Sequence, residues 1–368
     1  MVILILLFPG SYSFNFLPYS NPVLKIALGI EESTKKTFLF SNSALRIWGA
    51  ENLLEEKNLS FELLKENTIK LGGKFEVEKS VFVYSAEPIF FNNKPYEGFM
   101  NVMADDGKLF VVNYISTEKY LDGVLNGEIS SDWPEEALKT QAIISRSYAL
   151  YKYRKNKNLP WNLVSDTRDQ VYGGMSLADR NSHNAIVKTY GEVVTHGNAL
   201  VPTFFHSNSG GHTESAGNIW QKSMAYIKGK KTNYGKSDPD YRWEYEIPVR
   251  LLLSKLSNNG YPVPKIDSIS VSARNETGRV QRVKISGDGQ EMEIITTRMR
   301  SILGNRNLKS LMFDVSLNGN TVIFKGLGYG HGVGVCQWCA KEMAEEGMTA
   351  HEIIEYFYDD IRIRIFPG

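Results

Sequence analysis

The sequence predicts an α+β fold in which a β-rich N-terminal region and an inserted β-rich segment pack on a helical core, with a groove between them. Three observations support this prediction. Strand-like alternation fills residues 14–98, a long helix with apolar residues on almost every face follows Pro134, and strand-like alternation returns over residues 239–320. At 368 residues the chain can bury a sizeable core, in two domains or one elaborate domain.

The order of these patterns divides the chain into five parts. They are a leader (1–13), a β-rich N-terminal part (14–105), a core that contains Glu128 (106–230), a β-rich segment (231–320), and a glycine-rich loop with C-terminal helices that close the core (321–368). No internal repeat or low-complexity tract interrupts this order.

The leader has the composition of a short secretory signal. Val2–Phe8 is an apolar run too short to span a bilayer, and Ser11 and Ser13 supply small residues where a signal peptidase requires them. The first basic residue is Lys25, so the usual basic start is missing and a buried strand is the alternative. We expect secretion, and therefore a location outside the cytoplasm, in the periplasm or on the cell-wall side of the membrane.

Strands dominate the N-terminal part. Val23–Leu28 alternates, Thr37–Phe40 is short, and Glu76–Ser85 is rich in β-branched and aromatic residues. Asn52–Glu66 is expected to form a short amphipathic helix. No catalytic residue types are concentrated here, so we interpret this part as a scaffold.

The core begins with a strand over Gly107–Ile115, which leads into the stretch Tyr120–Leu150. Asp132–Glu136 signals the start of a helix, because Pro134 stands beside acidic residues of the first turn. We expect this helix to reach about Lys157 and to be buried, because a helix that is apolar all round has no solvent face. A helix over 178–189 and a strand over 192–195 follow.

The β-rich segment and the C-terminal part complete the expected elements. Strands are predicted over Tyr241–Ile247, Ile266–Val271, Val280–Ser286 and Glu291–Thr296, with a hairpin turn at 286–289 and a short helix near 297–303. A glycine-rich run over 326–334 precedes predicted helices over 335–346 and 351–358.

Composition narrows the possible partners. The net charge is +1 and 23% of residues are charged, so nothing indicates a nucleic acid or a strongly anionic ligand. Aromatic residues make up 12% of the chain, which fits a large core and equally fits a groove in which sugar rings stack.

Glu128 is the first candidate for chemistry. It lies in an apolar turn just before the buried helix, and an apolar environment raises a carboxyl pKa so that the group can donate a proton near neutrality. Arg146, in the middle of that helix, needs a partner because an unpaired buried cation is costly. The alternative is structural, with Glu128 capping a turn or pairing with Arg146, which would lower the carboxyl pKa.

A second candidate region is Val201–Trp220, where an apolar strand ends in small polar residues. Such transitions expose backbone N–H groups and let a ligand approach closely, so Ser209, Gly210 and Gly211 are expected near a site. The later glycine-rich run does not match a phosphate-binding signature, so its glycines are attributed to close packing around His331.

Metal and nucleophilic chemistry are the remaining alternatives. His206 and His212 together with Cys336 and Cys339 offer a Cys₂His₂ set for zinc. Neither pair has a familiar zinc spacing and the cysteines fall in a predicted helix, so buried thiols and no cofactor are favoured. Ser209 beside His212 lacks the G-x-S-x-G elbow of a serine hydrolase.

Three blocks resemble the SpoIID/LytB family of cell-wall proteins. The first is Tyr120–Leu150, the second begins at Phe205 with FHSNSGGHTES, and the third begins at Gly330 with GHGVGVCQWCA. They occur in the family's order and cover most of the chain from about residue 100 onward. The resemblance is therefore far more specific than any single short motif.

This resemblance implies a lytic transglycosylase that cuts peptidoglycan glycan strands, notably strands from which a partner amidase has removed the stem peptides. Glu128 matches the catalytic glutamate, which protonates the oxygen between N-acetylmuramic acid (MurNAc) and N-acetylglucosamine (GlcNAc) and then deprotonates the muramoyl 6-hydroxyl. Arg146 matches a functional arginine and is expected to bind substrate or to position Glu128. Tyr241 and Arg242 fall in a segment that carries Tyr and Lys in the family, and with Ser209, Gly210, Gly211 and His331 they are the expected substrate-binding residues.

Two departures leave alternatives open. Family members that bind zinc use cysteines near the second block, whereas the cysteines here stand in the third block, where the family has Ser and Gly. Other members enhance an N-acetylmuramoyl-L-alanine amidase, a role that needs no catalysis. A zinc hydrolase built on His206, His212 and the cysteines is a more distant alternative. Neither the oligomeric state nor a choice between sporulation and division follows from the sequence.

Overall fold

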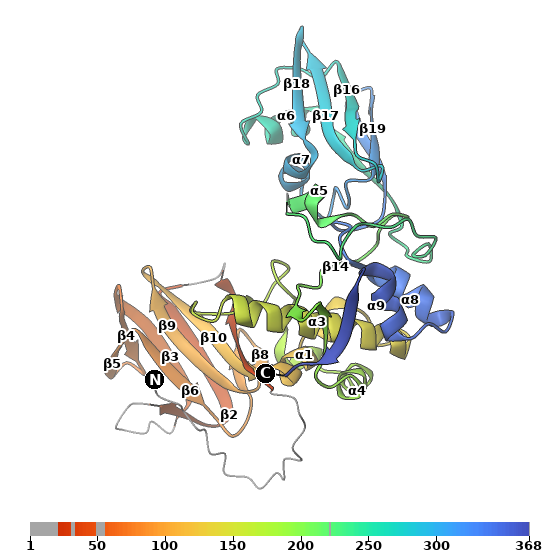
Figure 1. Cartoon of the computed structure of the whole chain (residues 1–368). Coiled ribbons are helices and arrows are strands. Elements are labelled where there is room, and N and C mark those ends of the chain that lie inside the picture. The colour runs from red at the N-terminus through yellow and green to blue at the C-terminus, as the bar shows by residue number, and fades with distance from the viewer. Residues whose placement is uncertain (1–20, 31–33, 49–55, 221, 368) are drawn as a thin grey trace.

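The computed structural model describes residues 21–30, 34–48, 56–220 and 222–367 (Figure 1). The expected leader, residues 1–13, lies outside the described residues. Strands and helices are mixed in several sheets, which confirms the predicted α+β class. Within the described ranges, no helix combines the length and apolar character needed to cross a membrane.

The N-terminal part forms a large sheet, coloured red to orange in Figure 1. Its strand order is β11-β1-β10-β9-β6-β2-β3-β4-β5, and off this path β7 pairs with both β2 and β8. The strands are β1 (Val23–Leu28), β2 (Lys36–Trp48), β3 (Glu56–Lys65), β4 (Thr68–Leu71), β5 (Phe75–Glu78), β6 (Ser80–Tyr84), β7 (Ile89–Phe91), β8 (Lys94–Tyr96), β9 (Phe99–Asp105), β10 (Lys108–Ser116) and β11 (Leu163–Val164).

The prediction of a helix over Asn52–Glu66 is wrong. Residues 56–65 form β3, which pairs with β2 and β4. Leu59 and Phe61 are buried two residues apart, so the segment has the period of a strand with one face in the core. Because apolar residues such as Leu63 and Leu64 stand next to each other, the sequence of so short a segment fits the period of a helix as well as that of a strand.

The core is arranged around one long helix, α3 (Glu135–Lys155), as predicted from Pro134 onward. Most of its residues between Ala137 and Leu150 are buried. Around it lie α1 (Thr117–Asp122), α2 (Leu125–Glu128), the 3₁₀ helix η2 (Gly174–Leu177), α4 (Arg180–Lys188), α8 (Gln337–Glu345), α9 (Ala350–Phe357) and a sheet of β12 (Glu192–His196), β13 (Ala199–Leu200) and β22 (Ile361–Ile365).

The inserted segment has its own hydrophobic core and stands away from the large sheet in Figure 1. Two three-stranded sheets form it, β15-β20-β19 and β16-β17-β18. Its elements are β15 (Arg242–Pro248), α6 (Val249–Ser257), β16 (Ser268–Arg274), β17 (Val280–Gly287), β18 (Gln290–Ile295), α7 (Thr296–Leu303), β19 (Phe313–Asn318) and β20 (Thr321–Leu327). The predicted hairpin turn joins β17 to β18, with positive φ at Asp288 (54°) and Gly289 (72°), as a type I′ turn requires.

The second and third sequence blocks meet between the core and the inserted segment. The short strand β14 (Phe205–His206) pairs in parallel with β21 (Val335–Cys336). Gly334 has φ 75°, and a Cβ there would lie 2.0 Å from the carbonyl oxygen of Phe204, so only glycine fits this approach. α5 (Ala216–Trp220) follows the second block.

A buried ion pair joins the first helices of the core. Arg146 is fully buried on α3, and its Nε and Nη2 each donate to one carboxylate oxygen of Glu118 on α1, both at 2.7 Å. The guanidinium also donates to the carbonyl oxygens of Ile186, at the end of α4, and Glu192, at the start of β12. This bidentate geometry satisfies a charge that would otherwise oppose folding.

We expect Glu118→Ala to lower the free energy of unfolding by about 3–5 kcal/mol, because it leaves the buried Arg146 cation unpaired. Urea denaturation followed by fluorescence measures this change. Glu291→Ala is the matched control, since its pair with Lys284 is exposed and should cost at most about 1 kcal/mol. Equal losses in the two variants would contradict a stabilising role for the buried pair.

Candidate active site

Glu128 is the last residue of the one-turn helix α2 and is half-buried at the mouth of the core. Its Oε1 accepts a 2.7 Å hydrogen bond from the backbone N–H of Val171. The adjacent Gly127 allows this approach, because a Cβ there would lie 2.8 Å from Leu177 and 3.1 Å from the carbonyl oxygen of Val171. The loop that carries Val171 therefore closes directly over the carboxylate.

Burial raises the pKa of Glu128 from 4.5 to about 7, and the hydrogen bond from Val171 opposes part of that rise. Near neutral pH the carboxyl group is thus present in both protonation states. A group in this condition can donate a proton and later accept one, which general acid–base catalysis requires. The direction of the shift is the one expected from the apolar surroundings in the sequence.

Gln337, the first residue of α8, supports Glu128. Its Nε2 donates to the backbone oxygen of Glu128 (3.3 Å) and to Oε1 of Gln141 on α3 (3.2 Å). Gln141 in turn donates to Ser145, 3.0 Å away. Sequence reasoning assigned no role to Gln337 or Val171, although Gln337 stands in the third block.

Arg146 does not lie where the resemblance suggested. Its side chain has no exposed surface, and its ionic partner is Glu118 rather than Glu128. A guanidinium enclosed in this way has no face for a substrate, so the expected direct contact with substrate or with Glu128 is corrected. The physical reason is the geometry of α3, which directs Arg146 toward α1 and α4.

The other expected binding residues gather around the second block. Ser209 and Gly210 are buried, whereas Gly211 and His331 are partly exposed. Gly210 has φ 69° and packs against Leu327, where a Cβ would lie 2.8 Å from the carbonyl oxygen. Tyr241 is half-buried, and its hydroxyl lies 3.6 Å from the position a Gly211 Cβ would take. Contact of these residues with a substrate stays a prediction.

Cavities are present beside the core and on the inserted segment. One of about 380 Å³ lies between the large sheet and the core, lined by residues such as Glu97, Asp122 and His183. The other, of about 640 Å³, lies on the inserted segment and is lined in part by the exposed Arg242, whose guanidinium lies 5.9 Å from the Tyr241 ring centre. Glu128 lines neither cavity.

The cysteines are not the free buried thiols that the sequence favoured. Cys336 and Cys339 form a disulfide at the start of α8. Cys336 precedes the first residue of the helix in an extended conformation, and the two Cα atoms lie 5.2 Å apart, within the usual range for a disulfide. In this state neither sulfur can serve as a thiolate ligand for zinc. Among the described residues, no three His, Cys, Asp or Glu side chains converge as metal ligands.

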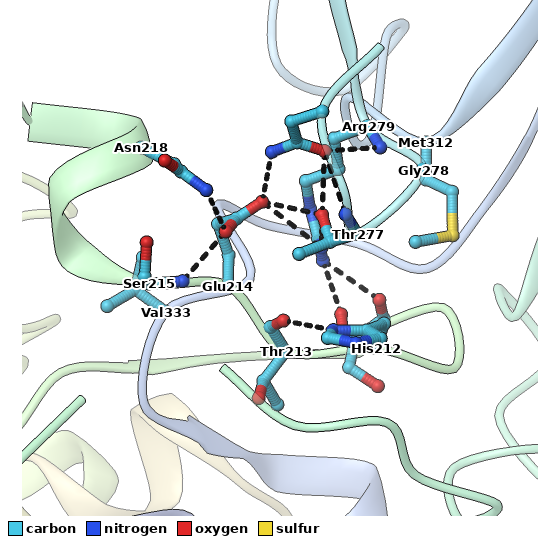
Figure 2. Close-up of polar contacts among 12 residues, drawn as sticks. His212, Thr213, Glu214, Ser215, Asn218, Thr277, Gly278, Arg279, Met312 and Val333 are labelled. Carbon is cyan, nitrogen blue, oxygen red and sulfur yellow. Dashed lines mark hydrogen bonds and ion pairs between the residues drawn. The ribbon is translucent and has the colours of Figure 1, made fainter. Parts of the chain in front are cut away.

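A buried polar cluster clamps the inserted segment to the second block (Figure 2). Glu214 is fully buried and accepts hydrogen bonds from the backbone N–H of Ser215 and from the side chain of Asn218. It also accepts hydrogen bonds from two residues of the insert, Asn275 (2.7 Å) and Thr277 (2.6 Å). Arg279, also in the insert, lies 3.7 Å from Glu214. The cluster therefore joins two segments that are distant in the sequence.

Arg279 connects this buried polar cluster, called the clamp below, to the loop of the second block. Its Nη2 donates to the carbonyl oxygens of Ser209 (3.0 Å) and His212 (2.8 Å). Burial lowers the pKa of Arg279 to about 10, which leaves it charged at neutral pH, and Glu214 opposes that lowering. The insert thus holds the backbone on both sides of Gly210 and Gly211.

Comparison with known proteins gives two family matches. A model described as stage II sporulation protein matches residues 105–196, and a model of a domain of unknown function matches residues 218–334. An uncharacterized protein of Brachyspira hyodysenteriae is 32% identical over 78% of this chain and 77% of its own length. Stage II sporulation protein D of Bacillus subtilis is 28% identical over 68% and 75%, and the amidase enhancer of the same organism is 26% identical over 65% and 39%.

The raised pKa of Glu128 predicts a pH-dependent stability difference. The folded state holds the proton more tightly than the unfolded state, so this contribution is present below pH 4.5 and is lost as the pH rises through about 7. Glu128→Gln stays neutral and should be more stable than the wild type at pH 8 by up to about 3 kcal/mol, but not at pH 4. Denaturant unfolding at both pH values measures the difference, and the exposed Glu355→Gln should show none. The same difference at pH 4 and pH 8 would count against a raised pKa.

The clamp gives a second prediction. Arg279→Met keeps the length of the side chain but leaves Glu214 without its cation, and we expect a loss of about 3–5 kcal/mol in unfolding free energy. Arg282→Met is the matched control, because its pair with Glu293 is exposed. Unfolding curves together with limited proteolysis of the insert would check this. A fully stable, protease-resistant Arg279→Met protein would show that the clamp contributes little.

Proposed function

Because this chain belongs to the stage II sporulation protein D family, with a role related to the cell wall, we propose that it is a lytic transglycosylase. The substrate is the MurNAc–GlcNAc bond of peptidoglycan glycan strands, so the protein acts outside the cytoplasm. The observation that carries the proposal is the half-buried Glu128 carboxyl, whose pKa is raised to about 7.

In the proposed reaction, protonated Glu128 first donates its proton to the glycosidic oxygen. The bond from that oxygen to C1 of MurNAc breaks, and the GlcNAc part leaves with a free hydroxyl. The carboxylate then takes the proton of the muramoyl 6-hydroxyl, and the 6-oxygen bonds to C1 to close a 1,6-anhydro ring. Glu128 ends in its starting protonation state and no water is consumed, so one carboxyl group can perform both steps.

The surroundings of Glu128 suit this exchange. Val171 occupies Oε1 with its backbone N–H, and among the described residues no hydrogen bond engages Oε2. Oε2 is therefore the oxygen that would carry the proton to the substrate. Gln337 holds the backbone of Glu128 to α3, so the carboxyl group stays in place between the two steps.

A second function follows from one of the relatives. The amidase enhancer of Bacillus subtilis shares 26% identity with this chain, and its name describes an effect on an amidase. The alternative proposal is that this chain binds glycan and enhances an N-acetylmuramoyl-L-alanine amidase without cutting the strand. In the first proposal the amidase is the partner that removes the stem peptides before cleavage.

Digestion of glycan strands that lack stem peptides separates the two proposals. Wild-type protein should release products with 1,6-anhydroMurNAc ends, identified by mass spectrometry, and Glu128→Gln should release none while still sedimenting with the strands. The rate should fall as the pH rises above about 7, because the first step needs the protonated carboxyl. Glu355→Gln, an exposed substitution of the same kind, should keep full activity.

Absence of anhydro products from the wild type would overturn the transglycosylase proposal. If, in addition, Glu128→Gln stimulates a purified amidase to the same extent as the wild type, the enhancer proposal replaces the transglycosylase proposal.

A further inference from the structure

Four ring side chains from different segments form a continuous row. Tyr148 of α3 lies edge-on to Phe204 with ring centres 6.1 Å apart, Phe204 contacts Trp220 at 4.5 Å, and Trp220 contacts His331 at 5.1 Å. We call these four residues the aromatic row. α5, which carries Trp220, lies between the core and the inserted segment in Figure 1, so the row leads away from α3 toward the insert.

The row begins on α3, the helix to which Glu128 is linked. Gln141, Ser145 and Tyr148 share one face of α3, and Gln141 is linked to Glu128 through Gln337. Tyr148 follows seven residues later, about 10 Å along the helix axis. Its hydroxyl donates to Asp169, in the same loop as Val171, at 2.7 Å. Glu128 and the row are therefore both anchored on α3, with the buried Gln141 and Ser145 between them.

The far end of the row is open to solvent. Trp220 keeps 42% of its surface exposed, although Phe204 and His331 support it from within. Tyr148 and Phe204 are half-buried in the core, whereas the Trp220 ring is held against Phe204 and His331 with much of its surface exposed. An indole held by two other rings is a rigid stacking surface whose order costs no further entropy when a ligand binds.

The row is also uncharged. Burial, together with Arg300 and Arg279, lowers the pKa of His331 to about 4, so its imidazole is neutral at pH 7. The neighbouring His206, 5.6 Å from His331, has its pKa lowered as well, mainly by burial. A neutral row of ring faces suits a pyranose, which has an apolar C–H face that can stack on them. It offers no cation for a phosphate.

We propose that the aromatic row is a saccharide-binding subsite, with Trp220 as its principal stacking residue. It binds sugar rings of the strand that lie beyond the bond cleaved at Glu128. This inference rests on the proposed function and extends it. It predicts that long glycan strands bind more tightly than disaccharides, because only a strand can reach Trp220 and Glu128 together.

The test measures binding without cleavage, in the Glu128→Gln background. Trp220→Ala should weaken binding of peptide-free glycan strands about fivefold to tenfold in a sedimentation assay, and Trp220→Tyr should restore part of it. Trp48→Ala is the matched control, because Trp48 is 54% exposed on the N-terminal sheet. In the otherwise wild-type enzyme, Trp220→Ala should raise KM on strands and leave kcat unchanged, and KM on a disaccharide substrate should not change.

The outcomes separate this inference from the proposed function. If wild-type protein cleaves strands and Trp220→Ala binds them as tightly as Trp48→Ala does, the subsite is overturned while the transglycosylase stands. If no variant cleaves but Trp220→Ala alone loses strand binding, the subsite stands and the transglycosylase fails. Loss of kcat together with a lowered unfolding free energy in both Trp220→Ala and Trp220→Tyr would show a structural role and overturn the subsite.

Discussion

The ion pair between Arg146 and Glu118 is the constraint on which the rest of the core depends. It ties α1 to α3, and the remaining donors of the guanidinium reach α4 and β12. Because the chain passes from α1 straight into α2, the pair also sets where Glu128 stands relative to α3. Arg146 thus fixes the position of a helix next to Glu128 without touching the Glu128 carboxyl group.

The site is assembled from parts of the chain that are distant in sequence. Glu128 comes from the first block, Val171 from the loop after α3, and Gln337 from the third block. The second block lies against the third through β14 and β21, and the insert holds its loop through Arg279. Each block therefore contributes a different part of the site.

The sequence predicted the elements with long, regular patterns and missed what depends on a distant partner. Pro134 marked the start of α3 correctly, and Asp288–Gly289 marked a real turn. The sequence predicted that Arg146 needs a partner, but it could not identify Glu118, because nothing in the local sequence distinguishes this buried carboxylate from the acidic residues that are exposed. Val171 contributes only its backbone N–H, which has no sequence signature. The disulfide was missed because the helix was expected to begin at Val335, before Cys336 rather than after it.

The pairing of β15 with β20 has a consequence for how the protein can vary. Arg242 stands opposite Leu327, so the chain enters and leaves the insert at neighbouring points on one two-stranded stem. Everything between those points can be lengthened, shortened or exchanged without rerouting the backbone of the core. What a replacement must preserve is a cation at the place of Arg279, facing the carbonyl groups of the second block. The insert is in this sense an exchangeable module whose polar contacts to the core include those of Arg279, Asn275, Thr277 and Lys309.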